Sequence, residues 1–147
     1  MPRSSQKKIL NYNAKDLFDI VLDIEAYPDF LPWCSASRII NYSNNLIIAD
    51  LLICYKNFNE TFRSFVDFNK KDLVISVKYT EGPLKSLYTN WQFDKISNNE
   101  TLIVFDLDIK FKFSPLNQIL NGFYKSIEDK MMNAFEKRAS KILEKDL

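Results

Sequence analysis

Few side chains in this 147-residue chain could carry out acid–base or nucleophilic catalysis. The chain contains no histidine, so Ser-His-Asp triads, Cys-His dyads and zinc sites that need histidine are excluded. Its cysteines, Cys34 and Cys54, form neither a CxxC pair nor a disulfide framework, and we interpret them as reduced structural residues. Its two glycines, Gly82 and Gly122, are too far apart for a Walker loop or a Rossmann fingerprint. The sequence therefore predicts a protein that is not an enzyme, with no catalytic residues, no metal and no cofactor.

The acidic residues do not change this interpretation. Asp106 and Asp108 alternate with apolar residues, which is typical of the solvated face of a strand. Glu60 has the same strand parity as Phe58 and Phe62 and could point inward, but no partner for acid–base chemistry accompanies it. We assign none of these carboxylates a catalytic role.

Large apolar side chains favour a binding role instead. A curved sheet around a helix encloses either a filled core or an apolar cavity, and the sequence leaves both open. If there is a cavity, we expect an apolar ligand inside it. The candidate cavity-lining residues are Phe58, Phe62, Trp91, Phe93, Phe105, Phe111, Phe123, Ile127, Met131 and Phe135.

A second candidate site is the segment 27–33, in which Pro28 and Pro32 stiffen a short turn. Four bulky side chains on one such turn cannot all enter a core, so we expect a cavity lid or a membrane-touching lip. The alternative is a plug packed over the end of the sheet. The four side chains are Tyr27, Phe30, Leu31 and Trp33.

The elements that must position these residues follow from hydrophobic spacing. We expect a short strand over residues 6–10, then a helix capped by Asn13, then about one helical turn around Pro28. Period-two alternation over residues 37–113, broken by short turns, predicts an antiparallel meander. Its last strand should turn Ile103, Phe105 and Leu107 toward the core.

A long helix should follow, from Ser114-Pro115 to about residue 145. We expect it to bury one apolar stripe, which consists of Leu116, Leu120, Phe123, Ile127, Met131, Ala134, Phe135, Arg138 and Ile142. Because the sheet is the large apolar surface available, the helix should pack on it. The predicted fold is therefore α+β: one domain over residues 1–147, with a curved antiparallel sheet around a long C-terminal helix and two short N-terminal helices.

Charge and hydropathy narrow the classes of partner that we expect for this chain. The 20 basic and 19 acidic residues give a net charge of +1, and no basic stripe is evident, which counts against DNA or RNA as a partner. The longest uncharged run, residues 113–124, is too short and polar to span a bilayer. No apolar segment follows the basic residues near Met1, so we expect a cytoplasmic protein that is at most peripheral at the inner membrane.

Several stretches spread along the chain form a recognisable set: residues 12–34 with Tyr27-Pro28-Asp29-Phe30-Leu31-Pro32-Trp33-Cys34, then Glu81-Gly82-Pro83-Leu84-Lys85, Trp91-Gln92-Phe93, Phe105-Asp106-Leu107-Asp108 and residues 134–139. These stretches resemble the coenzyme Q-binding START-domain family, part of the polyketide cyclase/START superfamily. That family includes mitochondrial coenzyme Q-binding proteins and the bacterial ribosome-association toxin RatA. The resemblance covers nearly the whole chain and implies a helix-grip fold, in agreement with the pattern above.

The resemblance implies an apolar cavity for a polyprenyl quinone. The leading hypothesis is non-enzymatic binding and transfer or presentation of ubiquinone, supporting respiration or quinone biosynthesis, with transient contact with a membrane surface. The alternative is a RatA-like toxin that binds a ribosomal subunit and blocks subunit association. A cyclase-like enzyme is the third possibility, but the family offers no catalytic motif to transfer, and one fold hosts many functions.

Overall fold

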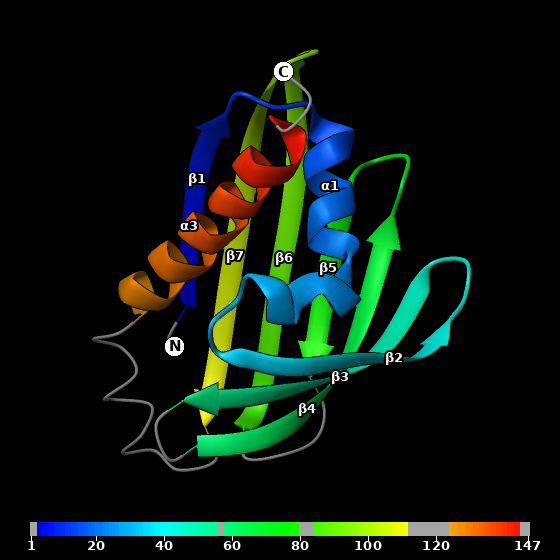
Figure 1. Ribbon diagram of the computed structural model, residues 1–147, viewed down its shortest axis with the longest axis vertical. Helices are drawn as coiled ribbons and strands as arrows, with labels where there is room; N and C mark the ends of the chain where they lie inside the picture. The colour runs from blue at the N-terminus through cyan, green and yellow to red at the C-terminus, as the bar shows by residue number, and fades with distance from the viewer. Residues whose placement is uncertain (1–2, 56–57, 80–83, 112–123, 145–147) are drawn as a thin grey trace.

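The structure of the chain is a computed structural model that describes residues 3–55, 58–79, 84–111 and 124–144. Two helical segments follow the first strand, then six strands, then a long helix (Figure 1). The elements are β1 (Arg3–Leu10), α1 (Ala14–Leu22), the 3-10 helix η1 (Ile24–Asp29), β2 (Cys34–Tyr42), β3 (Leu46–Tyr55), β4 (Phe58–Asn69), β5 (Val74–Tyr79), β6 (Leu84–Ser97), β7 (Glu100–Phe111) and α3 (Tyr124–Leu143). This order confirms the predicted α+β helix-grip fold.

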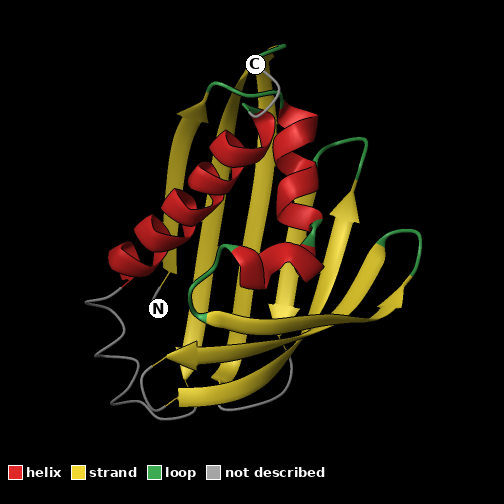
Figure 2. Ribbon diagram, in the orientation of Figure 1, coloured by secondary structure: helices red, strands yellow, loops and turns green. Residues whose placement is uncertain are grey.

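The strands form one seven-stranded antiparallel sheet in the order β1-β7-β6-β5-β4-β3-β2. From β2 to β7 each strand pairs with its neighbour in sequence, which is the predicted meander. The first strand instead crosses to β7, with Arg3 opposite Asp108 and Leu10 opposite Thr101. The helical segments α1, η1 and α3 lie on one face of this curved sheet (Figure 2).

Alternation along β7 sets which face is buried. Ile103, Phe105 and Leu107 are 3%, 0% and 2% exposed, so the predicted inward side of this strand is confirmed. Phe105 pairs with Trp91 of β6, and both side chains therefore point to the helix-covered face. The core consequently lies between the sheet and the helices.

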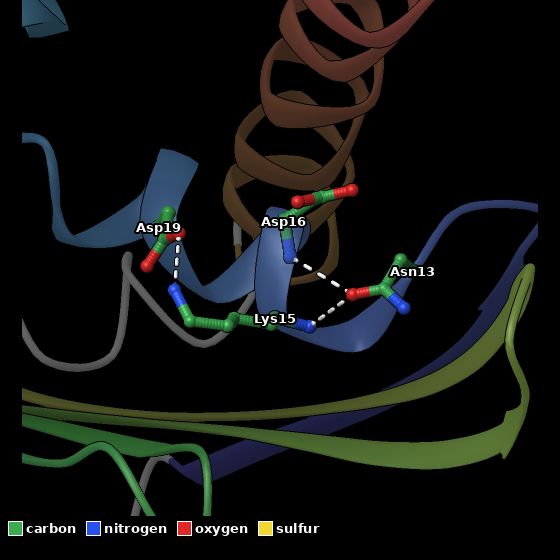
Figure 3. Close-up of polar contacts among 4 residues, drawn as sticks. All are labelled: Asn13, Lys15, Asp16 and Asp19. Carbon is green, nitrogen blue, oxygen red and sulfur yellow. Dashed lines mark hydrogen bonds and ion pairs between the residues drawn. The ribbon is translucent and has the colours of Figure 1, made fainter.

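The N-terminal cap of α1 agrees with the sequence prediction. Asn13 accepts hydrogen bonds at Oδ1 from the backbone N–H groups of Lys15 (3.0 Å) and Asp16 (3.4 Å), as Figure 3 shows. Its Nδ2 also donates to the carbonyl of Asn98 at 3.0 Å, in the turn between β6 and β7. One side chain thus caps α1 and fixes its start against the sheet.

The buried face of α3 differs from the predicted stripe. Its buried residues are Glu128, Met132, Phe135 and Ala139, whereas Met131 is half-buried and Ile142 is 39% exposed. Ala139 is fully buried because its small side chain lets the helix approach its neighbours closely. The prediction that Ile142 is buried is therefore wrong. The predicted start of this helix near Pro115 lies outside the described residues.

Candidate functional site: an aromatic turn and an open pocket beside α3

Four of the predicted cavity residues are packed against one another. Trp91, Phe93, Phe105 and Phe135 are between 0% and 6% exposed. The Trp91 ring lies 4.3 Å from the Phe105 ring and 5.1 Å from the Phe135 ring, measured between centroids. These are the separations of aromatic rings in direct contact. This part of the interior is a filled core.

The other predicted cavity residues are more scattered. Phe62 lies on the inner face of β4, half-buried, with its ring 4.6 Å from that of Tyr79. Met131 is half-buried on α3 and packs against the edge of the core. Phe123 and the side chains of Phe58, Phe111 and Ile127 lie outside the described residues. Whether any of these ten residues contacts a ligand stays a prediction.

The turn over residues 27–33 divides its bulky side chains between the core and the surface. Leu31 is 4% exposed and anchors the turn in the core, so it adds nothing to an exposed lip. The half-buried Tyr27 donates a hydrogen bond from its hydroxyl to the carbonyl of Val21. Burial raises the pKa of this hydroxyl, and the charge of Asp23 adds a smaller increase. Phe30 and Trp33 are also half-buried, and both reach the molecular surface.

Contacts with α3 hold the turn in place. The Phe135 ring lies edge-on to Tyr27 at 5.6 Å and to Phe30 at 5.2 Å. The Arg138 guanidinium lies 5.1 Å from the centre of the Phe30 ring, and its Nη2 lies 4.0 Å from Oδ2 of Asp29. Each ring pair contributes roughly 0.5–1.5 kcal/mol beyond its buried area, and the cation–π contact about 1 kcal/mol. The turn is thus fastened to α3 by side chains, as a lid or a plug would be.

A pocket of about 1120 Å³ opens beside this turn. Phe30, Pro32, Trp33 and Cys54 line one side of it, and Tyr12 contributes as well. The α3 side is polar and consists of Lys130, Asn133, Ala134, Glu136, Lys137, Arg138, Ser140, Lys141 and Glu144. Because its α3 side carries charged side chains and faces solvent, this is an open surface pocket and not an enclosed apolar cavity.

The lysines on the α3 side of the pocket contradict the expectation that the chain has no basic stripe. Lys130, Lys137 and Lys141 are all exposed and all line the pocket. Their spacings of seven and four residues place them on one face of a helix with 3.6 residues per turn. The net charge of +1 does not reveal this stripe, whereas the spacing of the lysines at helical intervals would have predicted it.

The two cysteines occupy different environments. Cys34 is 2% exposed, its thiol lies 3.5 Å from the carbonyl of Ala36, and burial raises its pKa. It is therefore a protonated thiol at neutral pH and a poor nucleophile. Cys54 is half-buried at the pocket wall.

The carboxylates give no catalytic constellation in the part of the chain that the structure describes. Glu60 is exposed, although its pairing with Ile53 puts it on the inner side of β4 as predicted. Asp106 and Asp108 are half-buried on the outer face. No group of three or more potential metal-binding side chains occurs among the described residues.

Polar contacts also tie α3 to the edge strand β1. The side-chain amide of Gln6 donates to Asp129 Oδ1 at 2.9 Å, and Lys8 forms an ion pair with Glu136. Neither contact was predicted, because the residues of each pair lie more than a hundred positions apart in sequence. They engage two carboxylates of α3, of which Glu136 also lines the open pocket and Asp129 does not.

Comparison with known proteins finds relatives that match most of this chain. The sequence model of a family described as "Polyketide cyclase / dehydrase and lipid transport" matches residues 10–136. "Ribosome association toxin RatA" of Rickettsia prowazekii is 37% identical over 139 residues, which cover 92% of this chain and 94% of that protein. A mitochondrial coenzyme Q-binding protein of Xenopus laevis is 26% identical, and the match covers 94% of this chain and 58% of that protein.

The solved structures agree in fold. The Zhui aromatase/cyclase of a Streptomyces species superposes with a TM-score of 0.86 at 13% identity, over 96% of this chain and 94% of that one. At this identity the likeness shows the shared fold alone. Among the described helices, none is both long enough and apolar enough to cross a bilayer.

Proposed function

We propose that this chain, which belongs to the polyketide cyclase/dehydrase and lipid transport family, acts by binding a ribosomal subunit and hindering subunit association. The observation that carries this proposal is the 37% identity to a ribosome association toxin over nearly the full length of both chains. The coenzyme Q-binding relative is less similar, at 26% identity, and this chain spans little more than half of it.

The packed interior supports this choice over quinone carriage. A polyprenyl tail needs an apolar space, and between the sheet and α3 the ring of Trp91 is in contact with the rings of Phe105 and Phe135. Admitting a tail among them would separate aromatic pairs worth about 0.5–1.5 kcal/mol each. The pocket outside the core is open to solvent, and its α3 side carries charged side chains, which suit a charged macromolecule better than an isoprenoid.

A catalytic role is less well supported than binding. Aromatase/cyclases share the fold, but function resides in site residues and not in a fold. This chain has no histidine, and burial keeps the Cys34 thiol protonated. We therefore propose a binding protein.

The test is an assembly assay with purified bacterial ribosomal subunits. Adding the protein in increasing amounts should lower the fraction of intact ribosomes in a sucrose gradient and should place the protein with one subunit fraction. Unchanged ribosome formation, with the protein remaining at the top of the gradient, would refute the proposal.

Ubiquinone remains the second candidate ligand, on the strength of the coenzyme Q-binding relative. Organic extraction of protein purified with and without added ubiquinone tests it. Ubiquinone bound in stoichiometric amounts would favour the carrier hypothesis, and its absence from both preparations would exclude that hypothesis.

A further inference from the structure

The outward face of α3 carries three lysines that form no ion pair within the described part of the chain. We call Lys130, Lys137 and Lys141 the α3 lysine stripe. At 1.5 Å per residue, the first two lie about 10 Å apart along the helix axis and the last two about 6 Å apart. All three are exposed.

The acidic residues on α3 and at its end are buried or engaged by other side chains. Glu128 is 4% exposed, Asp129 accepts a hydrogen bond from Gln6, and Glu136 pairs with Lys8 of β1. Glu144, at the end of the helix, accepts a hydrogen bond from Ser140. Glu136 and Glu144 line the same pocket as the lysines, but each is engaged by another side chain, whereas the three lysines form no ion pair with the described residues.

Unlike the three lysines, the neighbouring Arg138 is already engaged by groups of this chain. Arg138 has a side chain only 16% exposed, and it is engaged by Asp29 and by the Phe30 ring. It helps to hold the turn over residues 27–33, which forms the opposite wall of the pocket. The lysines thus line a concave surface whose other wall carries Phe30 and Trp33.

We propose that the α3 lysine stripe binds the phosphodiester backbone of RNA exposed on a ribosomal subunit. This inference rests on the proposed function and assigns the surface that performs it. Three exposed cations along one helix complement a row of phosphates, and the gain comes from releasing the counterions that phosphates hold. The half-buried Trp33 offers an aromatic surface on which a sugar or base could pack.

The same lysines would complement an anionic membrane less well. A membrane-binding lip needs apolar side chains that protrude beside the cations. Here Leu31 is buried, and Phe30 is engaged by Phe135 and Arg138. Inserting these side chains into lipid would require breaking the contacts that hold the turn.

The test compares three variants with the wild-type protein. The first replaces the stripe by glutamine (Lys130→Gln, Lys137→Gln, Lys141→Gln), and the second replaces it by arginine. The matched control removes three exposed lysines from the sheet and its turns (Lys71→Gln, Lys78→Gln, Lys95→Gln), which changes the net charge equally. Binding to isolated subunits is measured by co-sedimentation at several salt concentrations, and circular dichroism checks that each variant folds.

We expect the stripe glutamine variant to lose affinity by about eightfold per lost phosphate contact at 0.1 M salt, so roughly 60- to 500-fold for two or three contacts. The slope of log K against log salt concentration should become less negative by about 2–3 for this variant. The arginine variant and the sheet control should bind within threefold of wild type. Equal binding by the glutamine variant, alongside normal wild-type binding, would overturn this inference and leave the proposed function standing.

Two further probes separate the remaining outcomes. If wild-type protein binds no subunit, the proposed function fails, and protein-free ribosomal RNA becomes the test of the stripe. Lysine-dependent binding to that RNA would sustain the inference, and its absence would overturn it. Vesicles of phosphatidylglycerol and phosphatidylcholine are the other probe: tighter stripe-dependent binding to these vesicles than to RNA would overturn it in favour of a membrane surface.

Discussion

Phe135 joins the core to the aromatic turn, and its removal should be among the most damaging substitutions in α3. Its ring contacts Trp91 in the sheet and both Tyr27 and Phe30 in the turn, and it is 6% exposed. Replacing a buried phenylalanine by alanine costs about 3–5 kcal/mol through lost burial and the cavity left behind. For a chain of this size, that loss lowers the melting temperature by roughly 6–20 °C.

Urea unfolding of Phe135→Ala, followed by circular dichroism, measures this cost. The matched control is Ile142→Ala on the same helix, where the side chain is 39% exposed and we expect a loss of under about 1 kcal/mol. Comparable losses for the two variants would refute the orientation of α3 described above. Large losses for both variants would restore the helix face predicted from sequence, which contains both residues.

Three smaller predictions concern single groups. Asn13→Ala should lower the free energy of unfolding by about 1 kcal/mol in urea titration, because the cap of α1 is lost, and an unchanged midpoint would contradict the capping role. Burial raises the pKa of the Cys34 thiol from its ordinary value of 9.0, so the folded state favours the protonated thiol. The resulting contribution to the free energy of unfolding is present below pH 9 and is lost as the pH rises through the pKa of the folded state. Iodoacetamide labelling at pH 8, read by mass spectrometry, should therefore modify Cys54 well before Cys34, and equal rates would contradict it. Arg63 donates to Asp50 and lowers its pKa, so the small stability gained from this pair should be lost as the pH falls through that pKa; Asp50→Asn should abolish that acid-dependent loss in unfolding titrations.

The sheet was largely predictable because strand faces follow a period of two. Alternation along β7 identified Phe105 and Leu107 as buried without any knowledge of their partners. The cap at Asn13 was equally local, since it depends on the two residues that follow it by a few positions. The family resemblance was also visible in the sequence and is confirmed by the match over residues 10–136.

The helix face and the site depended on contacts that the sequence does not reveal. Met131 and Met132 are adjacent and equally apolar, and packing alone decides that the second is buried and the first half-buried. Leu31 looked like an exposed lip residue because nothing local shows that it enters the core. The lysine stripe was missed because Asp129 and Glu136 alternate with lysines in sequence, and the sequence does not reveal that residues of β1 engage both carboxylates.

The pairing of β1 with β7 has a consequence for synthesis of the chain. These partners lie about a hundred residues apart, so β1 emerges from a translating ribosome long before its partner exists. At about 5–20 residues per second, it waits several seconds or more with its backbone unpaired. The contacts from Gln6 and Lys8 to α3 form later still, because that helix follows β7 in the chain. The lysine-bearing face of α3 therefore takes shape only after residues 3–143 have all been made, so a nascent chain still short of α3 cannot present it to the ribosome that is synthesising it.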